Sequence, residues 1–162
     1  MWGWLGRRER AIPDALWQRT LDRYPFLAKL TKAERAHLRR LSGRFLAQKE
    51  FTGTERLHIS DEIALAIAAQ ACLPVLHLDQ RGRALQWYSD FVGIVVHRRE
   101  VVAQRETTDH TGVVHRYSEV LAGEAMHKGP VMLNWRDVAH AGAQAGHGYN
   151  VVIHEFVHKM DM

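Results

Sequence analysis

The sequence predicts one α+β domain over residues 1–162, built from N-terminal helices, a small mixed or antiparallel sheet and a C-terminal motif helix. Apolar residues recur at helical spacing through residues 1–80, and short runs of β-branched and aromatic residues follow over about 84–162. No linker, internal repeat or low-complexity segment divides the chain. With 162 residues, 46% of them apolar and 25% charged, the chain is long enough to bury its own core.

Two amphipathic helices are expected in the N-terminal part, at residues 13–24 and 31–49. In the first, apolar side chains fall close to one face, and a Tyr-Pro step ends the helix. In the second, Thr31 can cap the free amides of the first turn while Glu34 completes a capping box. The arginines of the second helix lie mainly on one face, so we expect its apolar stripe to face the core.

A third helix is expected after Ser60, a good N-cap that two acidic residues follow. From Ile63 this helix is almost wholly apolar until Pro74 stops it, which predicts the buried centre of the domain. The single cysteine, Cys72, lies in this run and cannot form an internal disulfide, so we expect a small buried side chain. A short strand is expected just before the helix, at residues 57–59.

Strands are expected in the second half of the chain, where short runs are rich in β-branched and aromatic residues. These runs are residues 85–88, 93–97, 101–105, 113–115 and 131–133. Residues 121–129 fit no element. A stretch rich in glycine and alanine, residues 139–148, then leads to Asn150, which is expected to cap the last helix.

The last nine residues begin with the motif His154-Glu155-Phe156-Val157-His158. On a helix, residues four apart have Cβ atoms about 5–6 Å apart, so the two histidines can direct their imidazoles at one ion. The glutamate is turned about 100° from the first histidine and can stand beside a metal without binding it. This pattern is typical of zinc peptidases, in which zinc lowers the pKa of a bound water and the glutamate acts as general base.

Apolar residues surround the motif and predict a zincin-type helix held in the interior, where zinc would satisfy the three polar groups together. The alternative is an amphipathic helix whose histidines meet solvent. Asp161, three residues after His158, either orients an imidazole or is a surface carboxylate. Glu124 either supports the site or caps backbone amides, and His147 is more simply a surface or core residue than a further ligand.

The net charge of +4 is unevenly spread along the chain. Residues 1–50 hold 12 Lys/Arg and 5 Asp/Glu, a net +7, which leaves 10 and 13, a net −3, for the rest. A basic N-terminal part can serve nucleic acid, an acidic partner or a membrane surface, although a solvated helical face is commoner. The sequence has no C-x-x-C pair, glycine-rich phosphate loop or basic stripe with spaced aromatics, so direct binding of nucleic acid is not expected.

The opening residues place Trp2 and Trp4 beside Arg7 and Arg8. This pairing suits a membrane interface or a docking tail, but a packed or frayed terminus is the simpler interpretation. No stretch approaches the roughly 20 apolar residues of a membrane span, and no secretory signal begins the chain. A cytoplasmic location is therefore expected.

Several segments carry a resemblance to a known family: residues 45–49 with Phe51 and Gly53, 67–74, 87–88, 112–115, 123–125, 129–131 and 150–156. In this order they resemble the Mlc titration factor A family of cytosolic zinc-dependent peptidases. The resemblance implies a gluzincin-like enzyme with aminopeptidase-type activity on short peptides. It also implies a role in binding Mlc, a glucose-responsive transcriptional repressor.

By position, the resemblance makes His154 and His158 zinc ligands and Glu155 the catalytic base. In that family the third zinc ligand is a glutamate well downstream of the motif, whereas this chain stops at Met162. We therefore expect the N-terminal part of a zincin-like peptidase, which lacks the family's C-terminal portion. Such a chain supplies two metal ligands and a base.

Two functions stay open from the sequence. One is a zinc-dependent peptidase that acts on a peptide substrate. The other is a regulatory module that binds a repressor and has an incomplete, inactive metal site. The run at residues 131–135 is placed like the substrate-binding edge strand of many zinc peptidases, and it fits an interior strand equally well.

Overall fold

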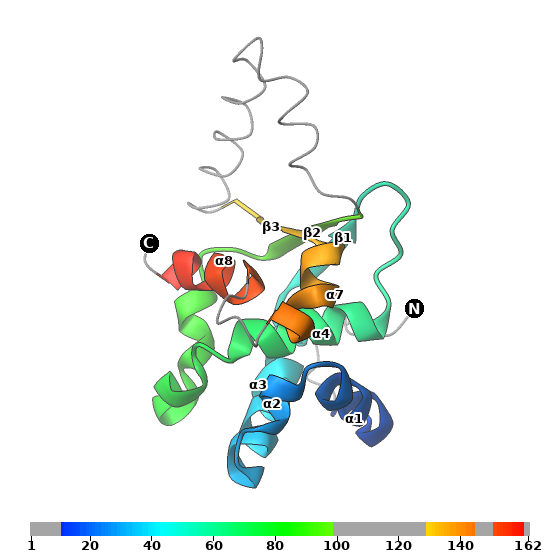
Figure 1. The fold of residues 1–162 in the computed structure, drawn as a ribbon. Helices are drawn as coiled ribbons and strands as arrows, with labels where there is room; N and C mark the ends of the chain where they lie inside the picture. The colour runs from blue at the N-terminus through cyan, green and yellow to red at the C-terminus, as the bar shows by residue number, and fades with distance from the viewer. Residues whose placement is uncertain (1–10, 99–128, 145–150, 161–162) are drawn as a thin grey trace.

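A computed structural model describes residues 11–98, 129–144 and 151–160 of the protein (Figure 1). The helices are α1 (Asp14–Arg23), α2 (Pro25–Ala28), α3 (Lys32–Gln48), α4 (Asp61–Cys72), α7 (Trp135–Gln144) and α8 (Val151–Met160). The strands are β1 (Glu50–Gly53), β2 (Gly93–His97) and β3 (Val131–Asn134). Three short 3₁₀ helices lie between α4 and β2, at Leu76–Leu78, Gln80–Gly82 and Ala84–Tyr88. The predicted α+β class is confirmed, while the assignment of residues 1–162 to one domain stays a prediction.

The predicted N-terminal helices are confirmed. Helix α1 buries the residues of its apolar face, which are Leu16, Trp17, Thr20 and Leu21. At the start of α3, the Glu34 amide donates to Thr31 Oγ1 at 3.1 Å and the Thr31 amide donates to Glu34 Oε1 at 2.9 Å. Both halves of the capping box are thus present, which satisfies two amides that the first turn would leave free.

Helix α4 is the buried centre that the sequence predicted. Ser60 caps it by accepting a hydrogen bond from the Ile63 amide, and every residue from 63 to 72 is buried. In Figure 1, α4 crosses the middle of the molecule between the sheet and the helices α1–α3. Cys72 is a free, fully buried thiol, and burial raises its pKa, as expected for a structural rather than a reactive cysteine.

The three described strands form a parallel sheet, so the prediction of a mixed or antiparallel sheet was wrong for this part of the chain. Its order is β1-β2-β3, and the register pairs Phe51 with Ile94 and Val96 with Leu133. Parallel strands need a long crossover, and α4 with the three 3₁₀ helices provides it between β1 and β2. The sequence showed short runs of β-forming residues but not how the chain returns between them.

One predicted strand, residues 85–88, is instead the 3₁₀ helix Ala84–Tyr88. Ala84 and Leu85 are both buried, which does not fit the alternation of a half-buried strand. The Tyr88 hydroxyl donates to the Ala71 carbonyl in the last turn of α4 at 2.7 Å. Packing against α4 therefore overrides the β propensity of this segment.

Strand β1 was not predicted, and the strand expected at residues 57–59 is not formed. Gly53, which follows the helix expected at residues 31–49, is the last residue of β1. A Cβ added at Gly53 would lie 1.9 Å from the Leu57 carbonyl oxygen. Glycine is needed here because the chain turns back closely on the strand end.

The strand predicted at residues 131–133 is confirmed as β3, and that at 93–97 as β2. The stretch rich in glycine and alanine, residues 139–148, was assigned to no element, and its first part is helical and belongs to α7. Asn134 starts that helix, since its Oδ1 accepts from the Asp137 amide at 3.0 Å. The strands predicted at 101–105 and 113–115, and the cap predicted at Asn150, lie outside the described residues.

Candidate metal centre

Helix α8 carries the motif and packs on the core through one face. Phe156, which occupies a variable position of the motif, is fully buried. Its ring lies 5.6 Å from Tyr88, 5.9 Å from Phe45 and 6.2 Å from Phe91, measured between centroids. Edge-to-face and tilted contacts of this kind prefer one ring orientation. The aromatic cluster of these four residues therefore fixes the rotation of α8 about its own axis.

The three motif residues lie on the exposed side of α8. His154, Glu155 and His158 are all exposed, whereas Val152, Phe156 and Lys159 are buried. The helical period separates these two sets. The prediction that the motif helix is held in the interior was therefore wrong for the described part of the chain, and α8 is amphipathic instead.

The two histidines converge. Nε2 of His154 and Nε2 of His158 are 2.9 Å apart, and the ring centroids are 4.4 Å apart with planes at 82°. Two nitrogens bound tetrahedrally to zinc at about 2.0–2.1 Å would be about 3.3 Å apart. The pair would need to open by only about 0.4 Å, which a small ring rotation provides. The residues present fit two neighbouring positions of such a metal.

A third ligand is not found in the described part of the chain. No group of three or more His, Cys, Asp or Glu side chains among the described residues is placed to hold a metal ion. The other candidates from the sequence, Glu124, His147 and Asp161, lie outside those residues. The described site therefore consists of two imidazoles and the neighbouring carboxylate of Glu155.

Lys159, directly after the second histidine, ties the buried side of α8 to the sheet. Its side chain is 3% exposed, and its Nζ donates to the Gly129 carbonyl at 3.1 Å, just before β3. Nζ also lies 3.8 Å from the Asp90 carboxylate and 5.2 Å from the ring centroid of Phe91. Burial lowers the pKa of Lys159, and the Asp90 charge opposes that shift.

Lys49, directly after α3, contacts the same residues near Asp90 and Phe91. Its Nζ donates to the carbonyls of Tyr88 and Phe91, both at 2.6 Å, and lies 4.1 Å from the Phe91 ring centroid. Burial lowers its pKa to about 8, Asp90 raises it, and Lys159 adds a further lowering. Lys49 thus fixes the Tyr88–Phe91 backbone against which Phe156 packs, while Lys159 approaches the same segment through the Asp90 carboxylate and the Phe91 ring. Neither lysine could be identified from the sequence, because their partners lie 30 or more positions away.

The geometry of the motif helix by itself indicates a class of protein. A helix that presents two imidazoles to one point, with a carboxylate directly after the first, is the arrangement of metal-dependent hydrolases with the H-E-x-x-H pattern. The chain belongs to the family described as glucose-regulated metallo-peptidase M90, whose model matches residues 3–162. The resemblance found in the sequence is thereby confirmed, and membership in a metallopeptidase family implies a metal.

Curated relatives match nearly the whole of this chain. It is 32% identical over 161 residues to Mlc titration factor A of Cronobacter sakazakii. The aligned region covers 99% of this chain and 58% of that relative. The corresponding proteins of Salmonella arizonae and Klebsiella pneumoniae are also 32% identical, with 61% and 57% of their lengths covered. The chain therefore spans about three fifths of the length of these relatives. None of the described helices is long and apolar enough to cross a membrane.

Proposed function

We propose that this chain provides the metal-binding helix and the general base of a zinc-dependent peptidase. The observation that carries the proposal is the convergence of the His154 and His158 Nε2 atoms, 2.9 Å apart on the exposed side of α8. Imidazole nitrogens suit zinc, and a catalytic zinc takes three protein ligands and keeps a position open. Two of those ligands are assigned to this helix.

Each residue of the motif has a distinct task in this mechanism. His154 and His158 bind through Nε2, which requires each neutral ring to carry its proton on Nδ1. Zinc, when bound, polarises the peptide carbonyl and lowers the pKa of a water towards about 7. The Glu155 carboxylate takes a proton from the attacking water and passes it to the leaving amine nitrogen.

The substrate proposed is a short peptide, cleaved in aminopeptidase fashion in the cytoplasm. Strand β3 supports this proposal, because it is the last strand of the described sheet and packs against α8. An extended peptide that adds to β3 through main-chain hydrogen bonds would run beside the motif residues. The fixed rotation of α8 would then set the distance between the bound peptide and Glu155.

A second proposed function is the binding of a glucose-responsive transcriptional repressor. It is supported by the relatives that bear the name Mlc titration factor A and match 99% of this chain. If the chain holds no complete metal site, this would be its main function. Because Glu155 is assigned to the chemistry alone, E155Q is expected to leave repressor binding unchanged.

Cleavage of aminoacyl p-nitroanilides, measured with added zinc, tests the first proposal. E155Q is expected to lose cleavage at least about a hundredfold while it retains zinc, because it removes the base but no ligand. H154A is expected to lose both. Cleavage by E155Q at the wild-type rate would contradict the assigned base, and zinc retention without any cleavage would favour the repressor-binding module.

A further inference from the structure

A surface groove of about 470 Å³ lies on the 3₁₀ segment between α4 and β2, and its lining residues are Leu78, Arg81, Arg83, Gln86 and Trp87. None of these residues belongs to the motif. The groove combines two arginines with exposed apolar side chains. Trp87 is 48% exposed and Leu78 is 42% exposed, so they are two of the four large hydrophobic side chains that are exposed in the described residues.

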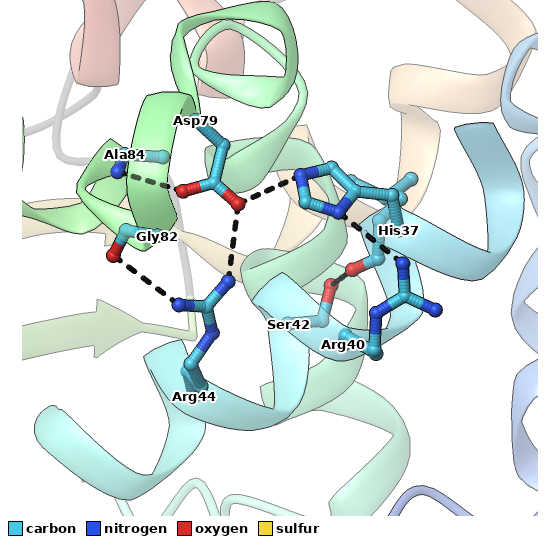
Figure 2. A network of polar contacts seen from close by, with 8 residues as sticks. His37, Arg40, Ser42, Arg44, Asp79, Gly82 and Ala84 are labelled. Atoms are coloured by element: carbon cyan, nitrogen blue, oxygen red, sulfur yellow. Dashed lines mark hydrogen bonds and ion pairs between the residues drawn. The ribbon is translucent and has the colours of Figure 1, made fainter. Parts of the chain in front are cut away.

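The buried carboxylate of Asp79, which lies in the same segment, holds its backbone in shape through the polar contacts that Figure 2 shows. Asp79 Oδ2 lies 2.8 Å from His37 Nε2 and 3.2 Å from Arg44 Nη2, and its Oδ1 accepts from the Ala84 amide at 3.0 Å. The Asp79 side chain is only 4% exposed. Burial would raise its pKa, but the Ala84 amide, Arg44 and His37 outweigh it and lower the pKa, which keeps the carboxylate charged.

This anchor fixes the backbone that presents the arginines. Arg44 also donates from Nη1 to the Gly82 carbonyl at 3.4 Å. Arg81 and Gly82 both have left-handed backbone conformations, with φ of 59° and 70°. Such a conformation is unfavourable for arginine and is maintained when the surroundings dictate it. Asp79, together with α3, thus places Arg81 and Arg83 on the outer side of the segment.

The charge of the groove is not neutralised by the described parts of the chain. The Asp79 carboxylate already pairs with His37 and Arg44. The Glu34 carboxylate pairs with His77 at 3.0 Å. Arg81 and Arg83 form no ion pair with any described residue. Two cationic side chains therefore lie beside an exposed tryptophan, and no anion among the described residues balances their charge.

We propose that this groove is a docking site for an acidic segment of a partner protein that also carries a large apolar side chain. Carboxylates of the segment pair with Arg81 and Arg83, and its apolar side chain covers Trp87 and Leu78. Tryptophan and arginine are the residues that most often dominate binding energy at protein interfaces. A single-stranded nucleic acid fits less well, because successive bases need several stacking aromatics and the groove has one.

Selection of peptides from a random dodecapeptide phage library on the immobilised chain tests the proposal. The selected peptides are expected to combine acidic residues with a large apolar residue. Fluorescence polarisation of one labelled peptide should show binding that weakens about tenfold or more in W87A and in the R81A/R83A variant. It should also weaken with added salt, as expected for partly exposed ion pairs.

Two matched variants serve as controls. R136A removes an exposed arginine from α7, and V92A removes an exposed apolar side chain outside the groove, so both should bind the peptide like wild type. Circular dichroism checks that each variant is folded. Selected peptides without acidic bias, no selection above background, or equal binding by the R81A/R83A variant would overturn the proposal. So would a labelled dT12 oligonucleotide that binds in an R81A/R83A-sensitive manner when the peptides do not.

Discussion

Helices α4 and α8 are both formed by apolar stretches of the sequence, yet they lie in different environments in the folded protein. Every residue of α4 from 63 to 72 is buried, whereas α8 buries Val152, Phe156 and Lys159 and exposes both motif histidines. In α8, polar residues recur at positions 154 and 158, one helical turn apart, and so form a stripe. A helix with such a stripe needs solvent or a metal beside it, whatever its mean hydropathy.

The largest expected effects come from the apolar anchors of the two helices. We expect Leu65→Ala in α4 to lower the free energy of unfolding by about 2–5 kcal/mol, and Phe156→Ala in α8 by about 3–5 kcal/mol. Only F156A should also weaken zinc binding, because it releases the rotation of the motif helix. Denaturant unfolding and zinc titration measure the two quantities.

Val157→Ala is the control for the anchors, since Val157 lies on α8 but is 38% exposed. Its free energy of unfolding should stay within about 0.5 kcal/mol of wild type. If V157A were as damaging as F156A, the aromatic cluster would not be what holds α8.

The next effect is the dependence of stability on pH that the buried Lys49 causes. Because the pKa of Lys49 falls from 10.5 to about 8 on folding, the unfolded chain binds more protons between pH 8 and 10.5, and stability gains from this group as pH rises. Relative to K49M, wild type should gain up to about 3 kcal/mol from pH 7 to pH 10.

Unfolding of both proteins at each pH measures this gain. The comparison with K49M is essential, because Cys72 and Tyr88 have raised pKa values and contribute the opposite trend in both proteins. A difference between wild type and K49M that does not change with pH would show that Lys49 has no lowered pKa.

The smallest effect is expected at the cap of α4. Ser60→Ala removes the acceptor of the Ile63 amide and should lower stability by about 1 kcal/mol. Thermal unfolding measures the loss, and S60T, which keeps a hydroxyl, should recover most of it. Zinc binding should be unchanged, since Ser60 caps α4 and the motif histidines lie on α8. A change in zinc affinity in S60A would mean that α4 and α8 do not respond separately.

The helices could be predicted from the sequence because their signals are local. Thr31 and Glu34 form the expected capping box, and Ser60 caps α4 as its position indicates. The strand direction could not be predicted, because four- or five-residue strands carry little pattern and their pairing depends on the crossover. Strand β1 was missed for the same reason, since Gly53 looks like a break until its contact with residue 57 is known.

The candidate site was predicted in part. The spacing of His154 and His158 gave the convergent imidazoles, because a helix fixes that geometry within one turn. The supports of the site, Lys49 and Lys159, could not be found, since each bonds to a carbonyl that the fold brings from a distant segment. Solvent exposure of the motif was the alternative rather than the expectation, because the apolar neighbours favoured a helix held in the interior.

Zinc affinity of the motif helix tests the central claim most directly. Competition with a chromogenic chelator should show zinc bound to wild type, and binding weakened at least about tenfold in H154A and in H158A, because each removes one of the two proposed ligands. E155Q, on the same helix, should bind within about threefold of wild type, since Glu155 is assigned as a base. Equal zinc binding by wild type and the H154A/H158A double variant would contradict the assignment of this helix as the metal centre.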